Sequence, residues 1–342
     1  VALHDFPGRR LFSWALVLPM AGPAFVVAYG YASLFDVAGP IRTAWRTAFG
    51  WDPPLEMRSL WGAALVMTLA FYPYVYLTLR AALISQSSSL AEAARTLGLN
   101  QRQTFMRVIL PLARPALAAG MALAAMETLA DYGATSYLTV QTLTTGVVRA
   151  WSVFYSAAEA ARLALPLLAT AAVLLWIERA GRPTTSETGQ ARWRELPRIR
   201  LKGGWGWAAT LYCLILIGLG LILPLGWLAS LGWRADNELP RLIEAGRNVL
   251  IVGAVAAAFT GGLATLVALG TRQGGFLPRL LSLGYATPGA VMAIGLLAPA
   301  GIIWRAFPST VSSFLMAVTL LFLAFAPRLM AAAPAPIDAG LQ

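Results

Sequence analysis

The 342-residue sequence is poor in the side chains that most metalloproteins and many enzymes depend on. It contains one cysteine, Cys213, and one histidine, His4. A disulfide or a multi-thiolate metal site needs at least two cysteines, so neither forms within this chain. A single histidine argues in the same way against a histidine-based metal site or catalytic triad. The sequence therefore predicts no enzyme, no metal site and no cofactor bound by this chain itself.

Charged residues are also scarce. They make up 12% of the chain, whereas soluble domains average about 25%, and 58% of the residues are hydrophobic. The mean hydropathy of +0.67 agrees with a membrane protein. The net charge of +11 would suggest nucleic acid as a partner in a soluble protein. Here the basic residues lie between long apolar runs, so we interpret them as a topology signal and expect no nucleic-acid partner.

Eight apolar segments are long enough to span a bilayer as helices, which takes about 20 residues each. They cover approximately residues 11–34, 60–83, 115–138, 163–177, 205–231, 248–269, 280–303 and 311–327. Helices are expected because lipid offers the backbone no hydrogen-bond partner outside its own segment. The predicted fold class is all-α, a polytopic membrane helix bundle with about eight transmembrane helices.

The orientation follows from the basic residues. If the eight spans alternate, about two thirds of the 26 lysine and arginine residues fall on one side of the membrane. The richer side is expected to be cytoplasmic. It contains the polar segment 85–114 and a charged linker over residues 178–204.

A weak internal repeat divides the chain. At an offset of 269 residues, Ser13 falls on Ser282 and Pro19 falls on Pro288. The first and seventh spans would cross the membrane in the same direction, as in a parallel repeat. We therefore predict the last four helices of a first half in residues 1–177, a cytoplasmic linker in 178–204, and the first four helices of a second half in 205–342. The second half would stop before its own counterpart of segment 85–114, as in a fragment of a longer protein.

The most specific signal is the polar stretch from Glu92 to Pro111, EAARTLGLNQRQTFMRVILP. Gly98 suits the end of a helix, where a left-handed residue is cheap only for glycine. A second short helix is expected over residues 100–110, ended by Pro111, because proline cannot continue a helix. The stretch predicts a helix–turn–helix finger on the membrane face.

This spacing resembles the cytoplasmic coupling loop of the membrane permeases of bacterial binding-protein-dependent ABC importers. Their loop reads EAA, three residues, Gly, nine residues, Ile, one residue, Leu-Pro. The matching residues are Glu92, Ala93, Ala94, Gly98, Leu110 and Pro111, with Val108 where isoleucine is usual. The resemblance implies that the loop docks on an ABC ATPase, present in two copies, which binds the ATP. It also implies a periplasmic or lipid-anchored substrate-binding protein as partner, and a location in the bilayer of the bacterial plasma (inner) membrane.

Two longer stretches, residues 5–40 and METLADYGATSYL at 126–138, look like the fused permease subunits of ferric-iron ABC importers. This resemblance implies a translocation path for ferric iron. Permeases for spermidine/putrescine, sulfate, molybdate or thiamine share the coupling loop and remain alternatives. A further alternative is an ion-coupled secondary transporter that uses Glu127 and Asp131 as a relay, although such a carrier has no use for a coupling loop.

Three polar residues in the third predicted span are candidates for the path. Glu127, Asp131 and Thr135 follow one another at four-residue intervals, which places them on one face of a continuous helix. Glu127 would lie roughly 18 Å from Pro115 at 1.5 Å per residue, near the middle of the membrane. Carboxylates at that depth face a water-filled path or the bundle interior. They either line the path or hydrogen-bond a neighbouring helix.

Prolines inside the predicted spans are candidates for kinks. Each one removes a backbone hydrogen bond and bends its helix. Because Pro19 and Pro288 coincide in the repeat, we predict that they form a paired gate.

Overall fold

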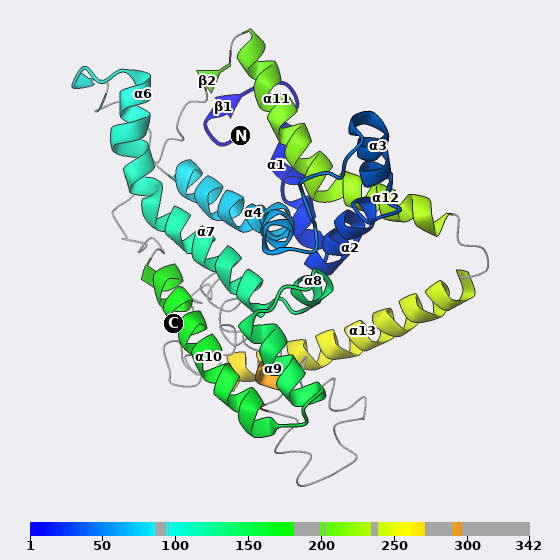
Figure 1. Ribbon diagram of the computed structural model, residues 1–342. Helices are drawn as coiled ribbons and strands as arrows, with labels where there is room; N and C mark the ends of the chain where they lie inside the picture. The colour runs from blue at the N-terminus through cyan, green and yellow to red at the C-terminus, as the bar shows by residue number, and fades with distance from the viewer. Residues whose placement is uncertain are drawn as a thin grey trace. The chain divides into compact units, whose positions relative to one another are not determined.

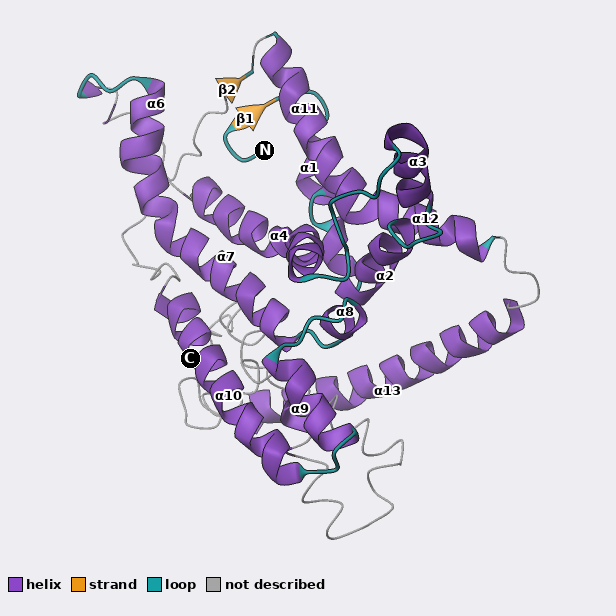
Figure 2. Cartoon of the chain, viewed as in Figure 1, coloured by secondary structure: helices purple, strands orange, loops and turns teal. Residues whose placement is uncertain are grey.

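The computed structural model describes residues 1–85, 94, 96–180, 199–201, 203–233, 239–270, 289, 291–293 and 295. Helices dominate these residues (Figures 1 and 2). The elements up to residue 152 are β1 (His4–Asp5), α1 (Arg9–Ala15), η1 (Leu18–Ala21), α2 (Ala24–Leu34), α3 (Pro40–Phe49), α4 (Leu60–Ser85), α6 (Gln101–Thr104), η2 (Phe105–Ile109), α7 (Leu110–Ala130), α8 (Gly133–Tyr137) and α9 (Leu143–Ser152). The later elements are α10 (Ala157–Ala180), β2 (Ile199–Arg200), α11 (Gly204–Ile217), η3 (Gly218–Ile222), α12 (Leu223–Gly232) and α13 (Leu239–Gly270).

The all-α prediction is confirmed for the described residues. Their only strands, β1 and β2, are two residues long and form a parallel pair in which His4 is opposite Ile199. Five helical stretches in this part of the chain are long and apolar enough to cross a membrane: Leu60–Ile84, Gln101–Ala130, Ala157–Glu178, Gly204–Gly232 and Pro240–Leu263. The bent pair Arg9–Ala21 and Ala24–Leu34 would make a sixth. The predicted spans 280–303 and 311–327 lie outside the described residues.

The first predicted span is broken rather than continuous. Its two parts meet at an angle of 86°. Gly22, between them, has the extended conformation (φ −89°, ψ 132°), which the following Pro23 favours by disfavouring the helical region for its neighbour. Pro23 is the N-cap of α2, which begins at Ala24.

At two other prolines the helix continues through a π-helical turn. The turn η2 precedes Leu110–Pro111, and the turn η3 precedes Leu223–Pro224. In each case the leucine N–H donates to the carbonyl five residues back, Leu110 to Phe105 and Leu223 to Gly218. The wider turn accommodates the proline ring, which in a regular α-helix clashes with the carbonyl four residues back.

The prediction that Pro111 ends the finger's second helix is therefore wrong. The segment from Gln101 to Ala130 is a continuous helical rod that joins the finger to the third span.

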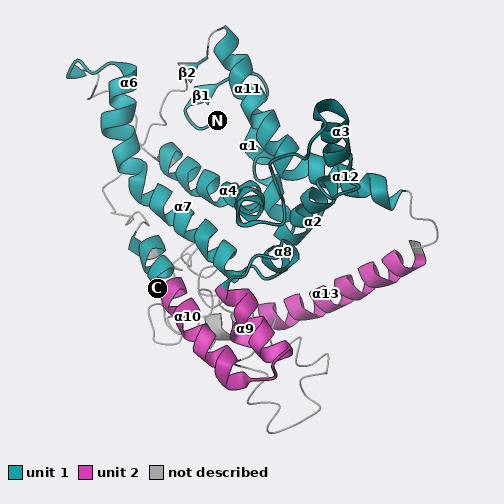
Figure 3. Ribbon diagram, in the orientation of Figure 1, with its two compact units in different colours: residues 1–142, 172–233 teal, residues 143–171, 234–342 magenta. Residues whose placement is uncertain are grey.

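The chain forms two compact units, residues 1–142 with 172–233 and residues 143–171 with 234–342 (Figure 3). The division into repeated halves at residues 177 and 204 is of another kind and stays a prediction. The second unit contains α9, most of α10, and α13.

In the first unit the helices approach closely at glycines. A Cβ atom on Gly120 of α7 would lie 2.2 Å from Thr78 Oγ1 and 2.8 Å from Val75 Cα of α4. A Cβ atom on Gly30 of α2 would lie 2.7 Å from Pro224 Cβ of α12. In lipid, where the hydrophobic effect does not drive helices together, such small residues allow the tight packing that holds a bundle.

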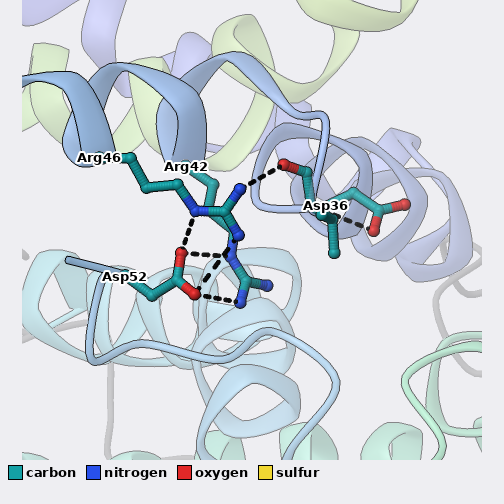
Figure 4. A network of polar contacts seen from close by, with 5 residues as sticks. Asp36, Arg42, Arg46 and Asp52 are labelled. Carbon is teal, nitrogen blue, oxygen red and sulfur yellow. Dashed lines mark hydrogen bonds and ion pairs between the residues drawn. The ribbon is translucent and has the colours of Figure 1, made fainter. Parts of the chain in front are cut away.

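Helix α3 and the turn after it are held by an ion-pair cluster (Figure 4). Arg42 and Arg46 lie one turn apart and both bind Asp52, with Arg42 Nη2 at 3.0 Å from Asp52 Oδ2. Hydrogen bonds from Arg42 and Arg46 hold the pKa of Asp52 well below its usual range. Gly50 ends the helix in the left-handed conformation (φ 75°), with its N–H bonded to Arg46 O at 2.8 Å.

Candidate functional site

The turn of the predicted finger is built as expected around Gly98. Its φ is +83°, and Leu99 N–H donates to Ala94 O at 3.1 Å. A bond between residues five apart that closes over a left-handed glycine is the Schellman arrangement of a helix C-terminus. A Cβ atom on Gly98 would meet nothing within 4 Å, so the conformation alone, not space, requires glycine here. The predicted turn at Gly98 is confirmed.

The next helix starts immediately with a capping box. Asn100 Oδ1 accepts from Gln103 N–H at 2.9 Å, and Gln103 Oε1 accepts from Asn100 N–H at 3.0 Å. These two bonds satisfy backbone donors that the first turn of a helix leaves without partners. The turn between the two helices is therefore fixed on both sides, by Gly98 before it and by Asn100 after it.

The finger's residues are divided between an exposed tip and a packed base. Leu97 is 82% exposed and Met106 is 50% exposed, and Arg102 and Arg107 are exposed as well. Figure 1 shows α6 at the far end of the rod that continues into α7. An exposed apolar tip flanked by arginines is a surface suited to a protein partner.

The other motif residues occupy different places. Val108, Leu110 and Pro111 are half-buried and lie in the π-helical turn and the start of α7. Ala94 is buried. Glu92 and Ala93 lie outside the described residues. The structure thus brings Gly98 to the turn and the Leu-Pro pair to the base of the rod.

Glu127 lies on α7 and faces α4. Its carboxylate accepts a hydrogen bond from Tyr74. Sequence reasoning missed Tyr74, although a tyrosine in an apolar span signals a hydroxyl that needs a partner. Glu127 is three residues from the end of α7 at Ala130, so it lies within the last turn of its helix.

The expectation that Glu127, Asp131 and Thr135 share one continuous helix face is wrong. Asp131 is extended (ψ 121°) and ends α7. Its Oδ1 accepts from the N–H groups of Ala134 at 2.8 Å and Thr135 at 3.1 Å, so its carboxylate caps the short helix α8. Thr135 is buried and its hydroxyl donates to Asp131 O at 2.8 Å. An aspartate whose side chain bonds the following backbone favours a break over a continued helix.

The two breaks in the first unit lie next to each other. A Cβ atom on Gly133, just after the break at Asp131, would lie 3.2 Å from Phe25 Cβ, just after the break at Pro23. Tyr137 of α8 packs edge-on against Phe25 with ring centroids 5.5 Å apart, and the Arg58 guanidinium lies 5.8 Å from the Tyr137 ring centroid. Helix breaks at membrane depth occur where the backbone is buried in protein or lines a cavity.

The groove on another face of the α4–α7 pair offers little polar chemistry. A cavity of ≈ 490 Å³ is lined there by residues that include Thr68, Phe71, Val75 and Thr128. The hydroxyls of Thr68 and Thr128 already donate to carbonyls one turn back, at 2.7 and 2.9 Å. The groove is therefore mainly an apolar packing surface.

Pro19 is buried in η1 against the π-helical turn η3. A Cβ atom on Gly220 would lie 3.4 Å from Pro19 Cγ. The Tyr31 hydroxyl donates to Leu219 O at 2.7 Å, which satisfies a carbonyl of that irregular turn. The other member of the predicted gate, Pro288, lies outside the described residues, and the gate stays a prediction.

Among the described residues, no group of three or more His, Cys, Asp or Glu side chains is placed to hold a metal ion. The chemistry that the described polar residues do offer is capping, helix pairing and surface contact.

A family model described as "Binding-protein-dependent transport system inner membrane component" matches residues 1–177. The Fe(3+)-transport system permease protein FbpB 2 of Haemophilus influenzae is 27% identical over 306 residues, which is 86% of this chain and 56% of that protein. No solved structure matches the chain.

Two shorter matches carry higher identity. The sulfate transport system permease protein CysT of Escherichia coli (strain K12) is 35% identical over 136 residues, 40% of this chain and 47% of that protein. The ferric transport system permease protein FbpB of Actinobacillus pleuropneumoniae is 35% identical over 123 residues, 36% of this chain and 18% of that protein. The chain thus spans about half of the first two relatives, and less of the third.

Proposed function

The chain belongs to the family of binding-protein-dependent transport system inner membrane components, and from this premise we propose that it forms the membrane path of an ATP-driven importer. It is a multi-pass protein of the plasma membrane, since the family is one of inner membrane components and the described residues hold at least five helices able to span. The family consists of transport components rather than enzymes. Membership also argues against the ion-coupled carrier.

The observation that carries the proposal is the geometry of the finger. A rigid turn at Gly98, an exposed tip at Leu97, and a continuous rod into α7 are what a helix-in-groove contact requires. We propose that this tip docks on the ATPase, with two ATPase copies per importer, and that closure of the ATPase upon ATP binding pushes on the rod. ATP would then be bound by the ATPase, and no cofactor by this chain.

A binding protein on the opposite side of the membrane would deliver the substrate. By the predicted orientation, α3 and the turn held by Asp52 lie on that outer side. The cluster of Asp52 with Arg42 and Arg46 gives this side a fixed, charged surface. We propose that the substrate enters from there and passes the helix breaks near Gly133 and Pro23, with Glu127 close to the route.

We propose ferric iron as the substrate. The alignment to the relative named for Fe(3+) transport covers 86% of the chain, so it must extend through residues 178–204 into the second predicted half. The alignment to the sulfate relative covers 40%. Because similarity to the relative named for Fe(3+) transport extends through both predicted halves, that relative is the better guide to the substrate of this chain.

Sulfate is the second candidate, because the CysT relative reaches 35% identity over its shorter alignment.

The test is uptake into proteoliposomes that contain the full-length permease, its ATPase and its binding protein. We expect ATP-dependent uptake of radioactive ferric iron and none of radioactive sulfate. A matched preparation with ADP instead of ATP controls for leakage. ATP-dependent uptake of sulfate without iron would refute the assignment of the substrate, and equal uptake of iron with ATP and ADP would refute the importer itself.

A further inference from the structure

The first unit contains a cavity that the transport path does not explain. It has a volume of ≈ 390 Å³ and lies between residues Val1, Ala2 and Phe6, helix α4 and helix α11. Its walls include Tyr72, Tyr76, Leu79, Arg80, Cys213 and Leu216. Most of this lining is apolar, and ligand cavities start at about 300 Å³. The pocket has room for part of an acyl chain.

Two polar atoms at the pocket are buried without a hydrogen-bond partner among the described residues. They are Arg80 Nε and the hydroxyl oxygen of Tyr72. Buried polar groups are nearly always paired, so two orphans in one pocket call for an explanation. The neighbouring Tyr76 hydroxyl, in contrast, donates to Ser13 O at 3.3 Å.

The charge of the pocket is positive. Arg9, near its wall, is neutralised by Asp5 at 3.2 Å. Arg80 forms none of the ion pairs found within the described part of the chain. A guanidinium without a carboxylate is a donor for an anion such as a phosphate.

The position of Arg80 fits the level of lipid headgroups. It lies five residues before the end of α4 at Ser85, about 7.5 Å along the helix at 1.5 Å per residue. The charge distribution predicts that this end of α4 is cytoplasmic, and the cytoplasmic leaflet holds the anionic lipids. The Arg80 side chain is half-buried there, with its Nε buried.

We propose that this pocket binds one anionic phospholipid. Its phosphate accepts hydrogen bonds from Arg80, and one acyl chain lies along Leu79 and Leu216. Basic pockets between membrane helices on the cytoplasmic side are a recognised form of anionic-lipid site. A zwitterionic lipid fits less well, because its own cation opposes the guanidinium.

The first test measures lipid retention on the full-length permease purified with its ATPase. Native mass spectrometry compares phosphatidylglycerol with phosphatidylcholine. We expect phosphatidylglycerol to be retained more strongly, and Arg80→Gln to weaken its retention about tenfold or more, since hydrogen bonds to charged groups have this strength. Tyr72→Phe should weaken it less. Arg10→Gln is the matched control, because Arg10 is an exposed cation on the same predicted side and does not line the pocket.

The second test uses Cys213 as a reporter within the pocket wall. Phosphatidylglycerol should slow alkylation of Cys213 by N-ethylmaleimide, and phosphatidylcholine should slow it less, as read from the mass of its peptide. Leu216→Trp fills the pocket without changing its charge and should abolish the retention of phosphatidylglycerol. Leu211→Trp on the same helix controls for bulk, because Leu211 is exposed and outside the pocket.

The outcomes separate clearly. Equal retention of both lipids, or an Arg80→Gln variant that retains phosphatidylglycerol as the native protein does, would overturn the proposal. Cys213 that is equally protected in lipid-free detergent would also overturn it, because the protein itself would then fill the pocket.

Discussion

Substituting Gly98 by valine places a β-branched side chain in a left-handed backbone conformation, φ +83°. Residues other than glycine pay about 1–2 kcal/mol there, and β-branched residues are outliers. Because a Cβ atom would meet nothing within 4 Å, the cost comes from the backbone alone. For alanine this energy corresponds to roughly a 5–30-fold loss of the docking-competent turn, and for valine the loss should be larger.

The variant Gly98→Asn tests whether docking depends on the left-handed backbone conformation or on the absence of a side chain. Asparagine adopts the left-handed region more readily than other residues with a Cβ atom, so Gly98→Asn should keep most of the docking that Gly98→Val loses. Glu92→Ala should weaken docking less than Gly98→Val, because it removes one polar contact and leaves the backbone path intact.

A second glycine in the chain provides the control. Gly50 is also left-handed (φ 75°), also ends a helix, and also has nothing within 4 Å of a Cβ atom. Gly50→Val therefore imposes a comparable backbone cost on α3, on the side predicted to be external. It should leave ATPase binding unchanged.

The assay is ATPase pull-down beside ATP-driven uptake in the same membranes, with the full-length protein quantified in each. We expect Gly98→Val to reach the membrane at near-normal levels, lose the ATPase and lose uptake. If Gly98→Val binds the ATPase and transports normally, the finger is not the coupling element. If Gly50→Val loses the ATPase equally, general destabilisation explains the result instead.

Five further outcomes are expected. Asp131→Ala should lower the free energy of unfolding by about 1 kcal/mol because it removes the cap on α8, whereas Asp131→Asn should not; thermal unfolding in detergent measures both. If Glu127 lines the path, Glu127→Gln should assemble with the ATPase yet transport poorly, and unchanged uptake would refute that role. Because the pKa of Asp52 is lowered, its ion pairs stabilise α3 at pH values above 3.8, the ordinary pKa of the group, and this contribution is lost only as the pH falls below 3.8. The native protein should therefore show a change in tryptophan fluorescence below that pH, and Asp52→Asn should not. Gly120→Leu should destabilise the α4–α7 pair by about 1–3 kcal/mol or more through overpacking, measured by the unfolding midpoint. A cysteine at position 186, in place of Ser186 of the predicted cytoplasmic linker, should resist a membrane-impermeant reagent applied to intact cells, and labelling from outside would reverse the orientation.

The features that the sequence predicted well are those set by local chemistry. Gly98 was expected to have a left-handed backbone conformation because a run of helix-forming residues ends there, and the structure confirms this conformation. Five of the spans predicted from apolar length correspond to helices able to cross a membrane, and the first corresponds to a bent pair. The third was misplaced most, since the helix runs from Gln101 to Ala130 and not from residue 115 to 138. Lipid leaves the backbone no alternative to helix over such runs, so length and hydropathy suffice.

The errors come from competition between local rules. Pro111 was expected to stop a helix, but a π-helical turn before it absorbs the ring and the rod continues. Asp131 was expected to continue a helix, but its side chain bonds the backbone ahead and ends it. Spacing at four-residue intervals assumes a continuous helix, so it could not reveal that break.

Other features depend on contacts between distant parts of the chain. Tyr72 and Arg80 meet Cys213 at one pocket, and Tyr31 reaches Leu219. Nothing in the periodicity of one segment indicates which face another segment will cover. The pocket and the π-turn contacts could therefore be found only from the fold.

If the finger couples an ATPase to the path, as proposed, the continuous rod explains why spacing, more than composition, would carry the coupling signal. From Gln101 to Ala130 the helix is about 45 Å long at 1.5 Å per residue, with the exposed finger at one end and Glu127 near the other. A helix holds its length through its backbone bonds, so a push at the tip is delivered at the far end. Its residues are also fixed in direction, since each residue added or removed between Gly98 and Pro111 would turn the tip by about 100° relative to the face that bears Glu127. A fixed number of residues between the glycine and the proline would therefore keep the proposed docking tip and the proposed path face in register.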